Sequence, residues 1–112
     1  MTKEFKNFIN NKWLDPISER YFESTNPADN SEVLGKFASS GTEDANLAIN
    51  SAFDAFGSWS GLSQLQRGEF LQKASSWLEE NSQNYADAIT KECGKSIAEA
   101  KGEVGRSVAL LR

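Results

Sequence analysis

The sequence contains no histidine and only one cysteine, Cys93, among its 112 residues. A single cysteine leaves no partner for an internal disulfide, which fits a protein of a reducing compartment. Zinc sites are built mainly from cysteine and histidine side chains. We therefore expect neither a zinc site nor a disulfide framework within this chain.

Long apolar runs and basic clusters are also missing. No run approaches the roughly 20 apolar residues that cross a bilayer, and Met1–Glu4 leads into no signal-peptide core. The formal net charge is -4, and lysine and arginine form no local cluster. We expect a soluble, cytoplasmic protein that binds neither nucleic acid nor membrane.

Residues 1–41 carry short apolar segments separated by turn residues, a pattern typical of β-strands. The expected strands are Phe8–Leu14, Tyr21–Thr25 and Val33–Ala38. We expect the first two to pair as a β-hairpin through a turn at Asp15–Glu19, and Asn26–Ser31 to form the next turn. Such strands are marginal alone, so they are expected to join a larger sheet.

Residues 42–112 have helical periodicity and predict four helices. The first has Thr42 as its N-cap, an apolar stripe, and Gly57 as its end. The stripe consists of Ala45, Ala48, Ile49, Ala52, Phe53 and Phe56. A capping box at Ser63–Gln66 opens the second helix, which is expected to run to about Asn81.

The third helix is expected at Ser82–Cys93 and the fourth from Ile97 onward. The apolar face of the fourth helix consists of Ile97, Ala100, Val104, Val108 and Leu111. Residues 108–112 are still periodic and include no glycine, proline or polar cap that would end the helix. We therefore expect the chain to be a fragment of a longer protein.

The segment Glu92–Val104 joins the third and fourth helices. Gly94 suits the left-handed residue that ends a helix, and Ser96 with Glu99 makes a capping box that opens the next one. Helical spacing places Cys93 on the apolar face of the third helix. This favours a buried thiol over a nucleophile, because an apolar setting raises a thiol pKa and no histidine is available as a base.

Other residues that attract a functional interpretation have simpler explanations. Lys95 and Lys101 are expected to be solvated or paired, although Lys95 could also bond the carbonyls of a helix end. Trp13, Trp59 and Trp77 are expected to be core or interface anchors rather than a set that stacks on a ligand.

In their order and spacing, these elements resemble the amino-terminal quarter of the aldehyde dehydrogenase superfamily, from about Phe8 to Arg112. The residues that carry the resemblance are Asn26–Pro27, Ala48–Ile49, Ala52–Phe53, Phe56, Trp59, Arg67, Leu71, Ala74, Leu78, Ala86, Glu92–Lys95, Glu99–Ala100 and Gly102–Val104. The resemblance implies an α/β fold in the full-length enzyme. In it, residues 1–41 would contribute to the oligomerisation sheet and residues 42–112 to the helical part of the nucleotide-binding domain.

The resemblance also implies an activity. Members of the superfamily oxidise an aldehyde with NAD or NADP through a thioester on a catalytic cysteine, and they assemble as dimers or tetramers. Their cysteine, their general-base glutamate and their nucleotide-binding glycine turn correspond to positions beyond this sequence. We therefore assign no catalytic and no cofactor-binding residue here, and we expect the chain alone to be inactive.

One metal site is implied by the resemblance. Several members hold a monovalent cation where backbone oxygens just ahead of the Asn-Pro turn approach an acidic residue, and the matching positions here are Ser24, Thr25 and Glu92. Oxygen ligands of this kind suit Na⁺ or K⁺. A plain hydrogen bond between the turn and the helix is the alternative at the same positions.

A substrate contact is implied at Arg106. In the superfamily the corresponding residue of the long fourth helix can point into the aldehyde tunnel, where a guanidinium would suit a substrate that ends in a carboxylate. The sequence of Glu99–Val104 and the longer turn at Asp29–Ser31 also resemble the corresponding segments of members that act on semialdehydes of dicarboxylic acids. A surface arginine on an amphipathic helix is the alternative.

Two functions therefore follow from the sequence. The first is the amino-terminal part of an NAD(P)-dependent aldehyde dehydrogenase, whose partners are the remainder of the same chain, further subunits and a small aldehyde. The second is a stand-alone helical interaction module without catalysis. The uncapped fourth helix and the family pattern favour the first.

Overall fold

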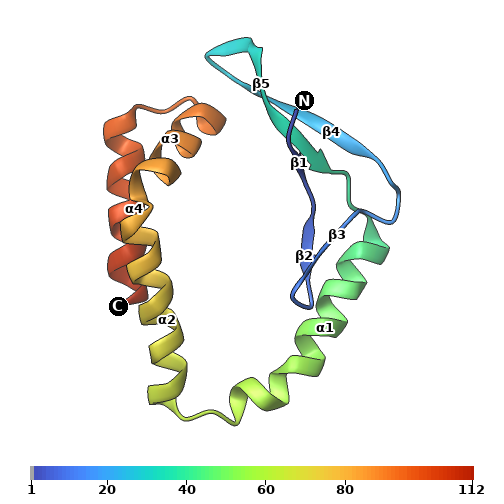
Figure 1. Cartoon of the computed structure of the whole chain (residues 1–112), viewed down its shortest axis with the longest axis vertical. Coiled ribbons are helices and arrows are strands. Elements are labelled where there is room, and N and C mark those ends of the chain that lie inside the picture. The colour runs from blue at the N-terminus through green and yellow to red at the C-terminus, as the bar shows by residue number, and fades with distance from the viewer. Residues whose placement is uncertain (1) are drawn as a thin grey trace. The chain divides into compact units, whose positions relative to one another are not determined.

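The computed structural model describes residues 2–112, which form five β-strands followed by four α-helices (Figure 1). The strands are β1 (Glu4–Phe5), β2 (Asn7–Ile9), β3 (Lys12–Leu14), β4 (Tyr21–Asn26) and β5 (Asp29–Ala38). The helices are α1 (Thr42–Ser60), α2 (Gln64–Glu80), α3 (Ser82–Cys93) and α4 (Ile97–Leu111). No helix within residues 2–112 is long and apolar enough to cross a membrane.

The chain divides into two compact units. The first comprises the residues up to Thr25 together with Asn30–Gly61, and the second comprises Asn26–Asp29 together with Leu62–Arg112. The strands and α1 therefore make up most of the first unit. The second unit contains α2, α3, α4 and the short turn between β4 and β5.

In the first unit, β5 is the central strand of a three-stranded sheet with the order β1–β5–β4. β1 runs parallel to β5, and Phe5 lies opposite Phe37, with the centroids of the two stacked rings 4.7 Å apart. A Cβ atom placed on Gly35 would lie 2.5 Å from a ring carbon of Phe5. Gly35 therefore leaves the space in which Phe5 packs on the sheet.

The expected strand Phe8–Leu14 is in fact a hairpin of β2 and β3, and the expected pairing with Tyr21–Thr25 is wrong. Asn10 and Asn11 have φ values of 50° and 60°, the left-handed conformation that a two-residue hairpin turn requires and that asparagine tolerates. Antiparallel pairing across this turn places Phe8 opposite Trp13. β4 instead neighbours β5, to which the Pro27–Ala28 turn connects it.

The start of α1 is fixed by Asp44 and differs from the expected N-cap. Gly41, not Thr42, is the N-cap, because its extended backbone precedes the first helical residue and its N–H donates to Asp44 Oδ2 at 2.9 Å. The N–H of Ile17 donates to Asp44 Oδ1 at 3.0 Å. Asp44 is buried, as is the neighbouring Pro16. The carboxylate thus ties the Pro16–Ile17 loop to the first turn of α1.

The end of α1 was expected at Gly57, but the helix continues to Ser60 and Gly61 is its C-cap. A glycine inside a helix costs about 1 kcal/mol relative to alanine, which does not end a helix by itself. The C-cap N–H of Gly61 donates to the carbonyl of Gly57 at 3.1 Å.

In the second unit, α4 packs along α2 and α3 (Figure 1). Ala86 of α3 with Ala100 and Val104 of α4 forms the buried cluster, and Leu78 and Ile89 pack against it. The expected bounds of α3 and the expected start of α4 are confirmed, as is the capping box that opens α2. The small side chains in this cluster let the three helices approach closely.

A buried hydrogen bond also joins α2 to α4. The hydroxyl of Ser75, which is fully buried, donates to the carbonyl of Val108 at 2.9 Å. Val108 lies in the last turn of α4, where carbonyls lack partners within the helix. Ser75 therefore satisfies a polar group that burial would otherwise make costly.

Candidate functional site

The joint between α3 and α4 is built around Gly94. This residue has φ 71°, in the left-handed region, and its N–H donates to the carbonyl of Thr90 at 2.9 Å. A Cβ atom on Gly94 would lie 3.0 Å from Cγ of Pro27, in the turn between β4 and β5. The expected helix stop is confirmed, and only glycine satisfies both the backbone conformation and the close approach.

The capping box at the start of α4 is also confirmed. The N–H of Glu99 donates to Ser96 Oγ at 3.3 Å, and the N–H of Ser96 donates to Glu99 Oε2 at 3.2 Å. The Ser96 hydroxyl donates to the same carboxylate oxygen at 2.8 Å and, with the Ser96 N–H, lowers the pKa of Glu99. The carboxylate of Glu99 is therefore committed to the cap rather than to a ligand.

The most prominent ion pair of the joint links Lys95 to Glu103, with Nζ 2.5 Å from Oε1. The hydrogen bond to Glu103 raises the pKa of Lys95 above its ordinary value of 10.5. Lys95 therefore stays protonated at neutral pH and is paired, one of its expected roles. A protonated, paired amine is not available as a general base.

Cys93 was expected to face the core. This expectation is wrong, because Cys93 is exposed in the structure. The core cluster uses the earlier turns of α3, at Ala86 and Ile89. The helix ends at Cys93, and the chain leaves this last turn uncovered. Trp13, Trp59 and Trp77 are also exposed, so the core role expected for them is wrong and the interface role stays a prediction.

The residues expected to bind a cation belong to two different elements. Ser24 and Thr25 are consecutive in β4, in the first unit, whereas Glu92 is an exposed residue of α3, in the second unit. The cation site at Ser24, Thr25 and Glu92 stays a prediction.

Arg106 lies on α4, on a different side from the buried Val104 and Val108. Its side chain is exposed, and within residues 2–112 it forms no ion pair. The guanidinium is thus free to meet a group from outside the described chain. Its contact with a substrate stays a prediction.

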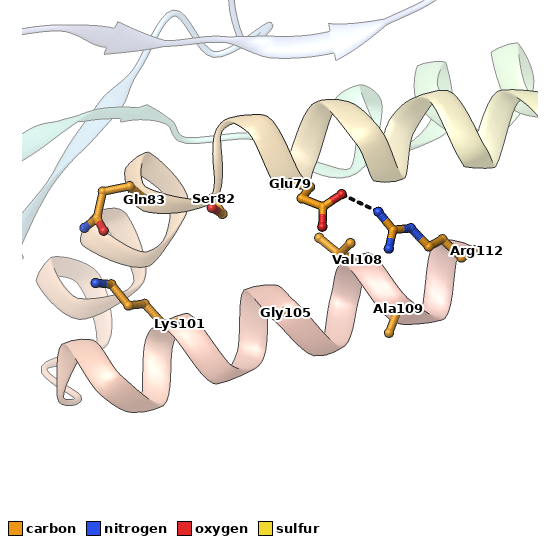
Figure 2. A pocket seen from close by; sticks show the side chains of 8 residues that line it. All are labelled: Glu79, Ser82, Gln83, Lys101, Gly105, Val108, Ala109 and Arg112. Carbon is orange, nitrogen blue, oxygen red and sulfur yellow. Dashed lines mark hydrogen bonds and ion pairs between the residues drawn. The ribbon is translucent and has the colours of Figure 1, made fainter.

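A groove of about 500 Å³ lies in the second unit, along α4 and beside the end of α2 and the start of α3 (Figure 2). Glu79 and Arg112 point toward one another at one end and form an ion pair. Lys101 and Gln83 lie toward the other end. Between them, Gly105 places no side chain in the groove.

Sequence reasoning did not find this groove, because it depends on how three helices meet. The one signal in the sequence was Gly105, a glycine within a helix that needs no left-handed conformation. Among the lining residues Glu79, Ser82, Gln83, Lys101, Gly105, Val108, Ala109 and Arg112, no nucleophile is held by a neighbouring base. The charged and apolar side chains of the groove offer a surface for packing and charge pairing.

Comparison with known proteins identifies the family. The aldehyde dehydrogenase family model matches residues 13–112, so the chain belongs to the aldehyde dehydrogenase family. It is 35% identical over 108 residues to the alpha-ketoglutaric semialdehyde dehydrogenase of Bacillus subtilis, covering 96% of this chain and 22% of that protein. A malonate-semialdehyde dehydrogenase of Bacillus velezensis is 36% identical over 106 residues, or 95% of this chain and 22% of its own length.

Solved structures agree with this assignment. A NAD-dependent aldehyde dehydrogenase from Sinorhizobium meliloti superposes with a TM-score of 0.93 at 25% identity, over 99% of this chain and 22% of its own. An NADP-dependent enzyme of E. coli superposes with a TM-score of 0.92 at 30% identity, over 96% and 22%. The chain thus spans about a fifth of its relatives' length, and it has the strands and helices of their amino-terminal segment, part of an α/β fold.

Proposed function

We propose that the chain forms the amino-terminal part of an NAD(P)-dependent enzyme that oxidises an aldehyde to a carboxylate. The observation that carries this proposal is the 35% identity with a semialdehyde dehydrogenase across 96% of the chain. The proposed substrate is a semialdehyde of a dicarboxylic acid, since both relatives named above act on such compounds by their names.

The role proposed for this segment is structural. Residues 1–41 would contribute strands to the oligomerisation sheet, and residues 42–112 would form helices around the nucleotide-binding domain of a cytoplasmic dimer or tetramer. The joint at Gly94 and Ser96 supports this role, because the Gly94 N–H and the capping box of Ser96 and Glu99 are paired within the fold. Chemistry on the aldehyde would be carried out by residues outside this chain.

The chain's own residues do not fit a site for NAD or NADP. A phosphate-binding loop needs glycines in a turn between a strand and the start of a helix. Within the described residues, Gly41 is the one glycine in such a turn, and its N–H is already bound to the Asp44 carboxylate. Gly57, Gly68, Gly102 and Gly105 lie within helices. The nucleotide would therefore be bound by the remaining four-fifths of the enzyme. Na⁺ or K⁺ at Ser24, Thr25 and Glu92 is a separate, smaller proposal, and stability that is indifferent to both ions would argue against it.

The proposed function can be tested with a chimeric enzyme. Residues 1–112 would replace the matching segment of the Bacillus subtilis relative, and NADH or NADPH formation from 2-oxoglutaric semialdehyde would be measured. We expect the chimera to form product and residues 1–112 alone to form none. A chimera that folds and assembles like the parent but lacks activity would contradict the proposal, as would activity from the isolated chain.

A further inference from the structure

Helix α1 carries a stripe of large apolar side chains that are open to solvent. Ile49, Phe53 and Phe56 follow one another at spacings of four and three residues, so they lie along one side of the helix. Their relative exposures are 63%, 79% and 65%. The sequence predicted that these residues share a face, and the structure shows that the face is uncovered.

The β2–β3 hairpin does not account for this stripe. The groove between the hairpin and α1 is lined on the helix by Ala48, Ser51, Ala52 and Ala55. Helical geometry places most of these positions about a quarter to a third of a turn away from the Ile49–Phe56 stripe. The hairpin therefore lies beside the stripe and leaves its large side chains free.

Polar residues border the stripe on its other side. Asn46 and Asn50 are exposed and follow the helical rows next to Ile49 and Phe53. A contiguous apolar surface with a polar rim is typical of a protein interface rather than of a solvated face. The same row continues to the exposed Asp54, whose negative charge disfavours a nucleic acid or an acidic lipid surface.

We propose that the Ile49–Phe53–Phe56 stripe is the docking surface through which this chain binds the other four-fifths of an aldehyde dehydrogenase polypeptide, whether joined to it or separate. We propose this binding partner because the chain matches only part of the length of its relatives. The fold superposes over 99% of this chain but only 22% of a relative, so in the relatives most of the polypeptide lies outside this segment. The inference rests on the proposed function, to which it adds the surface that holds the two parts together.

The experiment separates docking from catalysis. Residues 1–112 would be co-expressed with the Bacillus subtilis relative from which the matching segment has been deleted, and the complex would be measured by size-exclusion chromatography and titration. Phe53→Asp is the test variant, with Ile49→Asp as a second. Leu47→Asp is the matched control, because Leu47 is also an exposed apolar residue of α1 but lies on the opposite side from the stripe.

We expect a complex of defined stoichiometry whose Kd rises about tenfold or more for Phe53→Asp and Ile49→Asp and changes by less than about twofold for Leu47→Asp. Circular dichroism should show the same helix content in all variants. Absence of a complex, or equal effects of the three substitutions, would overturn the proposal. So would a homodimer of residues 1–112 that Phe53→Asp dissociates, since the occupant would then be a second copy.

The failure of this inference differs from the failure of the proposed function. An active chimera combined with no association of the separate parts rejects the docking surface alone. A specific complex combined with an inactive chimera rejects the proposed enzyme function and leaves the docking surface supported.

Discussion

Pro27 and Gly94 are in contact across the second unit: Cγ of Pro27 lies 3.0 Å from the point where a Cβ of Gly94 would stand. The turn between β4 and β5 therefore rests against the joint between α3 and α4. Asn26 holds this turn, with its Oδ1 accepting the N–H of Ala28 at 2.9 Å. Two short segments far apart in the sequence thus depend on one another, and the smallest side chain is required where they meet.

This contact predicts the effect of Gly94→Ala. The left-handed conformation costs an alanine about 1–2 kcal/mol, and the added methyl group presses on Pro27. We expect the free energy of unfolding to fall by at least this amount in urea titrations followed by circular dichroism. Gly102→Ala is the control, because its Cβ would stand in open space within α4, and it should raise stability by up to about 1 kcal/mol. Equal effects of the two would refute the explanation.

A second prediction concerns the link between α2 and α4. Ser75→Ala removes the buried hydroxyl that donates to the Val108 carbonyl, so we expect it to lower the free energy of unfolding by about 1–2 kcal/mol. Ser76→Ala, at the exposed neighbouring position, should change it by less than about 0.5 kcal/mol. If Ser75→Ala is as harmless as Ser76→Ala, the hydrogen bond contributes nothing to stability.

The second unit could be predicted well from the sequence because its signals are local. Ser96 with Glu99, Ser63 with Gln66, and Gly94 each act within one helical turn, so residue spacing alone locates the ends of the helices. The structure confirms each of these caps. The family could also be predicted from the sequence, because the resemblance depends on an ordered set of such local signals.

The first unit was predicted less well because strand pairing depends on contacts between distant residues. Asn10–Asn11 is a hairpin turn only when both residues adopt positive φ, and the apolar pattern around it also fits one continuous strand. Asp44 lies in the first turn of α1, but it also accepts a hydrogen bond from Ile17, 27 positions earlier, which no local pattern indicates. Exposure of Cys93 and the groove beside α4 likewise depend on where helices meet, which periodicity does not specify.

Asp44 predicts a pH dependence of stability. Its hydrogen bonds from the N–H of Gly41, and then of Ile17, lower its pKa in the folded state below the ordinary value of 3.8. The ionised carboxylate therefore stabilises the fold above the unfolded-state pKa, and this contribution is lost as the pH falls through the folded-state pKa. Asp44→Asn keeps one acceptor oxygen and turns a donor toward the other N–H, so we expect lower stability near neutral pH.

Urea titrations across a pH series would check this. The stability difference between the original chain and Asp44→Asn should be largest above about pH 5 and should shrink below about pH 4. Asp54→Asn is the control. The Asp54 carboxylate belongs to the same helix but forms no hydrogen bond within the described residues, so its removal should leave the loss of stability at low pH unchanged. A pH-independent difference for Asp44→Asn would contradict the assigned role.

Tyr21 and Asp15 predict a second titration. The phenol donates to Asp15 Oδ1 at 2.6 Å, and this hydrogen bond raises the pKa of Tyr21 to about 12. Absorbance titration in a Tyr85→Phe background, where Tyr21 is the only tyrosine, should show this value. Asp15→Asn should lower the pKa toward the ordinary 10.0, whereas Asp54→Asn should not. A Tyr21 titration that Asp15→Asn leaves unchanged would exclude the contact in solution.

Arg106 provides the sharpest test of the proposed substrate class. Its exposed guanidinium is unpaired within residues 2–112 and could bind the distal carboxylate of a semialdehyde in the complete enzyme. A charge-assisted hydrogen bond of this kind contributes about 1.5–3 kcal/mol, so Arg106→Ala in the chimera should lower kcat/KM for such a substrate about 10- to 100-fold. A neutral aldehyde of similar length should be affected by less than about twofold, and Arg106→Lys should recover part of the loss because it restores the charge without the planar fork. An equal loss of kcat/KM for the two substrates would mean that Arg106 is an ordinary surface residue of α4. Arg106 would then give no argument for a carboxylate-bearing aldehyde.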